Sequence, residues 1–376
     1  MRILLTHPFC WPYVRRGGER IFHELGVFLA DRGHHVTLLT SIPDASETEK
    51  KGNITIFREQ QFSNRLLARV GVLQETMFAW TCFRFLQRHQ FDVVGCLHYS
   101  DGFAAGLARR LGNPYVVHIM GLPYGKWIRR APWETLIMSR SVRRAERVLV
   151  LSSEAERRLE HYFGRQGEII GAPCDLALFP MQEGRDLQRP RILGVGAFSQ
   201  PRKGAAVLIR AFELLKRDFP SAILQYSGHL PSALKAQLLS TVPGDLGKDV
   251  EFLDVGNLAD LPNLYGQSAV TVLPSVEEAF GMTLVESLAC GTPIVGSRAG
   301  GIPDIVQDGV GFTFDPGDSH HNPSNPEGLA SAIKEAIQLH NDPCVHARCR
   351  RSAERFGWQQ IGPRIEDIYQ AAARWN

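Results

Sequence analysis

With 376 residues, 44% of them hydrophobic and 22% charged, the chain is too long for one ordinary core, which predicts two folded domains and excludes an intrinsically disordered protein. The net charge of +3 is unevenly distributed, since residues 1–180 hold 24 Lys and Arg against 17 Asp and Glu and the remainder holds 18 against 22. An anionic partner, such as a phosphate or a lipid headgroup, is therefore expected at the basic first half.

The first half alternates short apolar segments with helical ones. A helix is predicted from about Glu19 to Asp31. Strands are predicted at 2–7, within 32–40, and at 92–98, 115–121 and 147–152. Strands that are apolar on both faces and separated by helices indicate a parallel sheet covered on both sides.

The alternation restarts after a connection near 171–191. Strands are predicted at 191–198, 222–228, 250–254, 270–275 and 293–298, and the chain closes with helices at about 326–341, 343–356 and 358–374. The fold class is therefore α/β, with two Rossmann-like doubly wound domains. Ligands of such sheets bind at the carboxyl ends of the strands, so two facing domains would place the site in a central cleft.

The cysteine residues and the N-terminal sequence indicate the cellular compartment and whether a zinc site is expected. The seven Cys residues are widely spread without a CxxC pair, which predicts reduced thiols and no zinc site. The one cluster, Cys344, His346 and Cys349, fits no standard zinc spacing and is interpreted as incidental. The N-terminus lacks signal-peptide features and no apolar run approaches ~18 residues, which predicts a cytoplasmic protein.

The segment "EAFGMTLVESLACGTP", Glu278 to Pro293, carries the chemistry. It predicts a strand-end loop, a turn at Phe280-Gly281, and a helix whose N-terminal amides suit a phosphate. Glu286 lies about one turn further in and leans back toward the helix N-terminus, where a carboxylate can accept hydrogen bonds from a sugar diol. The residues alone leave a second interpretation open, in which Glu278 is a solvated loop residue and Glu286 lies on the exposed helix face.

The longer segment "PSVEEAFGMTLVESLACGTPIVGSRAGGIPDIV" closely resembles the retaining glycosyltransferases of family 4, which have the GT-B fold. Five further segments resemble the family in order, at residues 17–40, 145–159, 194–215, 250–275 and 355–369. The resemblance implies an acceptor-binding domain at 1–180, joined by the C-terminal helix at about 360–376, and a donor-binding domain at 181–359. It also implies transfer from a nucleotide-sugar, a UDP- or GDP-sugar, to a hydroxyl of a saccharide, lipid-linked or small-molecule acceptor.

The resemblance also implies site residues. Glu278 would contact donor-sugar hydroxyls, while Lys203 and Arg202 would neutralise the diphosphate. Glu286 would bind the ribose. The remaining donor contacts would be the amides of Phe280, Gly281, Met282 and Thr283, the loop glycines Gly17 and Gly18, and, near the base, Gly228, Leu253 and Val255.

Contacts on the acceptor side are less sharply defined. His118, on a predicted strand, is a candidate for donor-sugar or acceptor contact, with a packed core histidine as the alternative. The loop at 8–16, with Tyr13 and Arg16, is the predicted acceptor side. Family members that act on lipid-linked acceptors dock on membranes, and the segments 65–80 and 126–147 are candidates for peripheral contact with the inner face of the cell membrane. Solvated arginines on core-facing helices explain those segments equally well.

No Asp-x-Asp occurs in the sequence. The resemblance and this absence together predict transfer without a divalent metal or other cofactor, with fixed cations and helix amides stabilising the leaving group. The chain departs from the family at Ala197, where members often carry Arg, at Met120, where they often carry His, and at the "GAPCD" turn. These departures leave open a non-catalytic sugar-nucleotide-binding protein, and an epimerase of the same fold is a further alternative. A nicotinamide oxidoreductase or a P-loop enzyme lacks its glycine motif here.

Overall fold

The computed structural model describes residues 1–14, 16–61, 73–123, 125–182, 184–253, 258–317 and 322–374. The chain divides into two compact units. Unit 1 comprises Met1–Pro173 and Trp358–Asn376, and unit 2 comprises Cys174–Gly357. The predicted boundaries, near residues 180 and 360, lie a few residues beyond these divisions.

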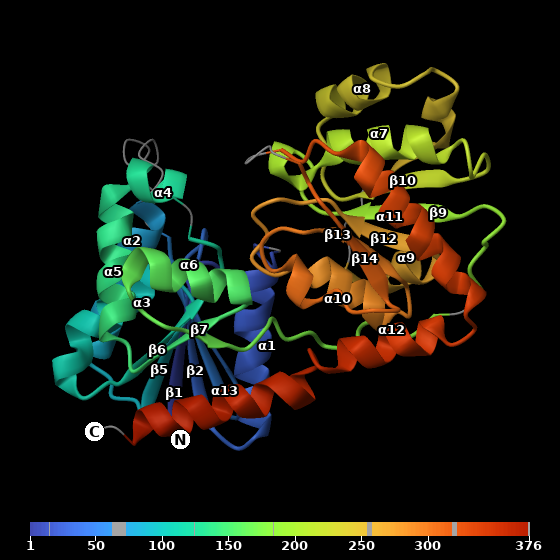
Figure 1. Ribbon diagram of the computed structural model, residues 1–376. Helices are drawn as coiled ribbons and strands as arrows, with labels where there is room; N and C mark the ends of the chain where they lie inside the picture. Colours follow the sequence, from blue (N-terminus) through green and yellow to red (C-terminus); the bar gives the residue numbers. More distant parts are fainter. Residues whose placement is uncertain are drawn as a thin grey trace. The chain divides into compact units, whose positions relative to one another are not determined.

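Unit 1 is built on an eight-stranded sheet in the order β3-β4-β2-β1-β5-β6-β7-β8. Figure 1 labels β1, β2, β5, β6 and β7 of this sheet. Its pairs are parallel except β3 with β4. The strands are β1 (Arg2–Thr6), β2 (His35–Ile42), β3 (Glu47–Lys51), β4 (Ile54–Gln60), β5 (Val93–Cys96), β6 (Tyr115–Ile119), β7 (Arg147–Val150) and β8 (Glu168–Ile169). All residues of β5 and β6 are buried, which is why these strands are apolar on both faces.

Helices cover both faces of this sheet. They are α1 (Gly17–Asp31), α2 (Leu73–Leu86), α3 (Tyr99–Ala108), α4 (Gly125–Arg130), α5 (Pro132–Arg144), α6 (Ser153–Phe163) and α13 (Trp358–Ala373). Helices α2, α3, α5 and α6 share one core with the strands. Helix α13 brings the end of the chain back against α1 (Figure 1). Trp358 of α13 stacks on Phe28 of α1, with ring centroids 5.6 Å apart.

Unit 2 is a six-stranded parallel sheet in the order β11-β10-β9-β12-β13-β14. Its strands are β9 (Arg191–Val195), β10 (Ile223–Ser227), β11 (Val250–Leu253), β12 (Val270–Leu273), β13 (Ile294–Ser297) and β14 (Gly311–Phe314). Its helices are α7 (Ala205–Leu215), α8 (Ser232–Ser240), α9 (Leu261–Gln267), α10 (Met282–Ala289), α11 (Pro326–Gln338) and α12 (Val345–Glu354), with a 3-10 turn, η3, at Pro201–Lys203. The buried core joins α7 and α11 to the strands.

The strand order of each sheet reverses once, between β1 and β5 in unit 1 and between β9 and β12 in unit 2. Such a switch point is where doubly wound sheets bind ligands, since the chain leaves neighbouring strands in opposite directions there. The predicted α/β class with two parallel sheets is confirmed. The sequence prediction missed β3, β4, β8 and β14.

Candidate functional site

Two loops meet at the switch point of unit 2, at residues 196–204 after β9 and 274–281 after β12. The backbone N–H of Val276 donates to the Arg202 carbonyl at 2.9 Å. The Arg202 guanidinium donates to the Glu277 carbonyl at 3.3 Å. These two bonds fix the loops to each other, so side chains from both can act on one ligand.

Lys203 and Glu278 form an ion pair across these loops. The Lys203 Nζ lies 2.5 Å from Glu278 Oε2, and their side chains are only 14% and 19% exposed. Ser275 donates to the same carboxylate oxygen at 3.1 Å. An ammonium has three protons, so two remain for another anion, and Glu278 Oε1 accepts no hydrogen bond within the described ranges. The pair can therefore bind a ligand with both a negative group and hydroxyls.

Lys203 ends the 3-10 turn η3, and α7 starts at Ala205. Gly204 separates them at φ 77, in the left-handed region that ends the turn. A Cβ there would lie 2.8 Å from the Pro274 carbonyl oxygen, so the glycine permits the close approach of the two loops.

The Glu278 backbone is also fixed. Its carbonyl accepts the N–H of Gly301 at 2.8 Å. The preceding Gly300 has φ 60, and a Cβ there would lie 2.1 Å from the same carbonyl oxygen. Glu277, at φ 58, has the one positive φ of a non-glycine residue in the described ranges. Such a backbone is strained and is typical of functional loops.

The N-terminus of α10 opens at this loop. Gly281 has φ 123, and the first turn of the helix carries the amides of Met282 and Thr283. Thr283 Oγ1 is buried and has no hydrogen-bond partner among the residues that the structure describes, which marks a polar position that a ligand can satisfy. The Phe280 side chain packs against Phe356 at 5.2 Å between ring centroids, so only its backbone is left for a ligand. Free amides and an unpartnered hydroxyl at a helix N-terminus are chemically suited to an anion.

Glu286 lies further along α10 and is 4% exposed, which excludes the interpretation that it lies on the exposed helix face. Its Oε2 accepts a hydrogen bond from the Tyr265 hydroxyl at 2.7 Å. Burial, together with the Glu286 charge, raises the pKa of the Cys290 thiol to about 12, so that cysteine is unreactive. Tyr265 on α9 was not predicted as a site residue. The sequence feature that could have indicated it is its position within segment 250–275, which resembles the family.

Two of the three predicted base contacts lie at the carboxyl edge of the same sheet. The N–H of Gly228, just after β10, donates to the carbonyl of Leu253 at 3.2 Å. Gly228 has φ 125, and a Cβ there would lie 2.3 Å from the Gly196 carbonyl oxygen. Val255 lies outside the described residues. Ala197, the departure from the family Arg, is exposed in the loop after β9.

The switch point of unit 1 carries two histidines that were not predicted. His7 follows β1 and His98 follows β5, with ring centroids 6.4 Å apart. Burial lowers the pKa of His7 to about 4 and that of His98 to about 3, so both imidazoles are neutral at physiological pH. The sequence feature that could have indicated both residues is a histidine that follows a buried strand.

The glycines and the acceptor-side residues predicted for unit 1 lie in or next to α1. Gly17 and Gly18 form the first residues of this helix, which begins two residues before the predicted Glu19. Arg16 donates to a first-turn carboxylate at 3.0 Å, and Tyr13 is 53% exposed. These side chains are placed in unit 1, whereas Lys203, Glu278 and Glu286 are placed in unit 2.

His118 is packed and also lines a pocket. Its Nε2 lies 2.8 Å from the Tyr369 hydroxyl, and the side chain is 2% exposed. Burial lowers its pKa to about 3. No group of three or more His, Cys, Asp or Glu in the described part of the chain is placed to hold a metal. The helices within those same ranges include none with the length and apolar character of a membrane span.

Family models match both units. The model described as "Glycosyltransferase Family 4" matches residues 15–177, and that described as "Glycosyl transferases group 1" matches residues 189–338. The chain belongs to this glycosyltransferase family. The expectation drawn from the resemblance is confirmed at the level of the family.

Curated relatives span many glycosyltransferases. The chain is 27% identical over 248 residues to a phosphatidyl-myo-inositol mannosyltransferase of Propionibacterium freudenreichii, covering 63% of this chain and 59% of that protein. It is 29% identical over 253 residues to a D-inositol 3-phosphate glycosyltransferase of Nocardiopsis dassonvillei, covering 61% and 57%. The matched region therefore spans less than two thirds of the length of these relatives.

Solved structures show the fold. A sucrose-phosphate synthase from Thermosynechococcus elongatus is 20% identical, covers all of both chains and has a TM-score of 0.81. Anabaena HepE in complex with UDP-glucose is 18% identical, with 99% and 100% coverage and a TM-score of 0.69. The glycosyltransferase family and these neighbours assign the two parallel-sheet units to the GT-B fold.

Proposed function

We propose that this protein is a retaining glycosyltransferase that moves a sugar from a UDP- or GDP-sugar to a hydroxyl of a saccharide, lipid-linked or small-molecule acceptor. The observation that carries the proposal is the Lys203–Glu278 pair, held beside the N-terminus of α10 at the switch point of unit 2. Lys203 supplies charge for a diphosphate, Glu278 Oε1 an acceptor for sugar hydroxyls, and Glu286 an acceptor for the ribose. The UDP-glucose complex of HepE favours a UDP-sugar.

The proposed chemistry follows from the charge that develops on the departing nucleotide diphosphate. Lys203, Arg202 and the first-turn amides of α10 are fixed before the reaction, so they stabilise that charge without reorganisation. The sequence contains no Asp-x-Asp to bind a divalent metal, and we propose that none is required. In front-face attack, the departing phosphate would take the acceptor proton, and the sugar would keep its anomeric configuration.

We place acceptor binding in unit 1, with His118, Tyr13 and Arg16 as candidate contacts. The protein is proposed to act in the cytoplasm, with peripheral membrane contact through the basic unit 1. Exposed Trp133 and the arginines of α4 and α5 support that contact.

A donor screen tests the function. Full-length protein is titrated with UDP-, GDP-, ADP- and dTDP-sugars in the presence of EDTA, following thermal stabilisation and slow donor hydrolysis. Stabilisation and hydrolysis with one nucleotide-sugar are expected. Binding without hydrolysis or transfer would instead support the non-catalytic binding protein, and no binding to any donor would mean that Ala197 and Met120 mark a lost site.

A further inference from the structure

Unit 1 contains a pocket of about 290 Å³ at the carboxyl ends of β5 and β6. Residues 97–99, residues 118–123 and Met138 line it. The volume is close to the lower end of the range for small-molecule sites. All of these residues belong to unit 1, so the pocket is complete within that unit.

Most polar side-chain groups of the lining already have partners inside the protein. His118 Nε2 bonds the Tyr369 hydroxyl at 2.8 Å. His98 Nδ1 bonds Ser100 Oγ at 2.7 Å. The Tyr99 hydroxyl donates to a carboxylate on α5 at 3.2 Å. Within the described residues, His98 makes its hydrogen bonds through Nδ1, and none is made by its Nε2.

The remaining lining is apolar. Leu97, Ile119, Leu122 and Met138 contribute aliphatic side chains or a thioether. Met120 completes the wall. Methionine is unbranched and polarizable, so it adapts to apolar ligands of varied shape. The wall at Met120 is therefore apolar and adaptable.

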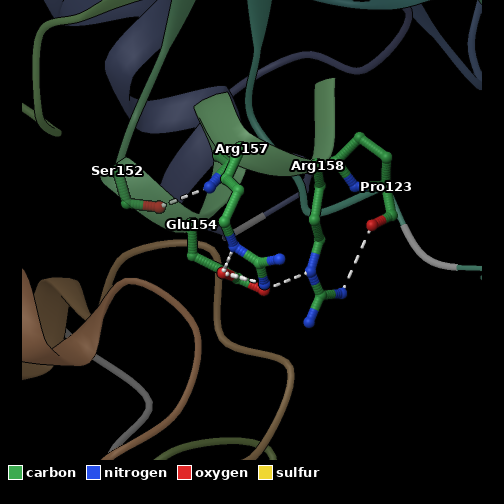
Figure 2. A network of polar contacts seen from close by, with 6 residues as sticks. Pro123, Ser152, Glu154, Arg157 and Arg158 are labelled. Atoms are coloured by element: carbon green, nitrogen blue, oxygen red, sulfur yellow. Dashed lines mark hydrogen bonds and ion pairs between the residues drawn. The ribbon is translucent and has the colours of Figure 1, made fainter. Parts of the chain in front are cut away.

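The loop that forms this wall is fixed to α6. Figure 2 shows Arg158 reaching from α6 to the Pro123 carbonyl, a hydrogen bond of 3.2 Å. Glu154 orients Arg158 through a contact of 2.5 Å, and also binds Arg157 (Figure 2). Ser152 caps the start of the same helix. The pocket wall is therefore held in place before a ligand arrives.

We propose that this pocket holds the apolar part of the acceptor, an alkyl chain or an aromatic ring attached to the group that bears the accepting hydroxyl. The inference rests on the proposed transferase function. His98, a lining residue, supplies the hydrogen-bonding group for the polar end of that acceptor. Apolar burial supplies the affinity, at roughly 25 cal/mol per Å² removed from water.

Methionine methyl NMR on the full-length protein tests the inference. The chain has six methionines, of which Met120 and Met138 line the pocket, while Met181 and Met282 lie in unit 2. The protein is labelled at the methionine methyl carbons, and each signal is assigned by a Met→Leu variant. Hexyl, phenyl and methyl β-D-glucoside are then titrated separately.

The hexyl or the phenyl glucoside is expected to shift the Met120 and Met138 signals in a saturable way. The concentration that gives half of the full shift should be at least ten times lower than for methyl glucoside. Met181, 47% exposed, is the control for non-specific binding and should not shift. A preference for hexyl indicates a lipid chain, and a preference for phenyl an aromatic group. Equal affinity for all three glucosides, or shifts at Met181 alone, would overturn the inference.

Two variants test whether the pocket itself binds the apolar group. Met138→Trp fills the pocket and should weaken hexyl or phenyl glucoside binding at least tenfold. If that variant does not fold, Met120→Gln, at a half-buried wall position, should lower the same affinity without changing that of methyl glucoside. UDP is titrated in parallel and should shift Met282, at the start of α10. If UDP shifts Met282 but no glucoside shifts Met120 or Met138, the pocket inference is rejected and the proposed donor site is kept. If the glucosides shift Met120 and Met138 but UDP does not shift Met282, the proposed donor site is rejected and the pocket inference is kept.

Discussion

The carboxyl group of Glu278 is positioned by contacts from three parts of unit 2. Lys203 binds it from the loop after β9, and Ser275 binds it from the end of β12. The backbone of the same residue is held by Gly301 after β13. A group fixed in this way loses little entropy on meeting a ligand, which is the condition for electrostatic preorganisation.

Glu278→Gln tests the charge at this position with little change in shape. The amide cannot pair with Lys203 as an anion, and its interaction with donor-sugar hydroxyls is weaker. We expect kcat for sugar transfer to fall by about 10²-fold, a loss of the size seen when one preorganised group is removed. The Kd for UDP, measured by calorimetry, should change far less, because the proposed nucleotide contacts remain.

Glu213→Gln is the matched control, since Glu213 is a carboxylate of the same unit that pairs with Arg210 on the surface of α7. It should leave both kcat and Kd unchanged. An unchanged kcat in Glu278→Gln would contradict a role for this carboxylate in transfer and would favour the non-catalytic binding protein.

Gly300 is required by sterics rather than by chemistry. Gly300→Ala places a Cβ 2.1 Å from the Glu278 carbonyl at a φ of 60. The left-handed backbone alone costs an alanine about 1–2 kcal/mol, so we expect a loss of unfolding free energy of at least that size in urea. Gly244→Ala is the control, because a Cβ at Gly244 meets nothing within 4 Å. Equal stability of the two variants would mean that the loop at Glu278 readily shifts.

Helix α13 is the element that closes unit 1. It follows unit 2 in the chain, yet its Glu366 bonds His34 at 2.9 Å and Arg32 at 3.0 Å, more than 330 residues away in sequence. Burial alone would raise the pKa of the Glu366 carboxyl, but the hydrogen bonds from His34 and Arg32 and the Arg32 charge lower it overall. The ionised carboxylate is therefore part of what holds α13 on the sheet.

Glu366→Gln should destabilise unit 1 at pH 7, by about 1–2 kcal/mol, since hydrogen bonds to a charged group are lost. A lowered pKa in the folded state contributes stability that is present above the ordinary value of 4.5 and is lost as the pH falls through the lowered pKa. The difference between wild type and variant, measured as urea midpoints, should thus be larger at pH 7 than at pH 3.5. Asp367→Asn, at an exposed position of the same helix, is the control. A difference that stays constant with pH would contradict the assignment.

Elements with a simple apolar pattern were predictable from the sequence. The buried strands β1, β5, β9 and β12 lie where the pattern places them, because parallel strands are apolar on both faces. Strand β3 was missed because its sequence, "ETEKK", is exposed at every residue and carries no such pattern. It is specified by pairing with β4, an interaction that local sequence does not show.

The position of the predicted site residues follows from the sequence where those residues lie close in the chain. Glu278 and Glu286 lie on one strand–loop–helix segment, so their spacing alone places both in the loop and helix that follow β12. The contact between Lys203 and Glu278 joins positions 75 residues apart, and only the strand order β9-β12 brings them together. His7 and His98 were not predicted, because their proximity arises only from the pairing of the neighbouring strands β1 and β5.

Charge is divided between the two units. Unit 1 holds 26 Lys and Arg against 18 Asp and Glu, whereas unit 2 holds 16 against 21. Because net charge acts at long range on an approaching surface, the membrane proposal assigns the attraction to anionic lipid to the basic unit and not to the acidic one. Exposed aromatic side chains add interfacial affinity, and Trp133 at the start of α5 is 75% exposed.

The full-length protein should therefore sediment with anionic vesicles of phosphatidylglycerol at low salt and much less at high salt, where screening is strong. Arg129→Glu with Arg130→Glu, at two exposed positions of α4, should weaken that binding on the order of 30-fold or more, at about 1 kcal/mol for each cation lost near the surface. Arg189→Glu with Arg217→Glu makes the same charge change at exposed positions of unit 2 and should have a smaller effect. No sedimentation with anionic vesicles would end the membrane proposal. Equal effects of the two pairs would show that overall charge, and not a surface of unit 1, controls the attraction.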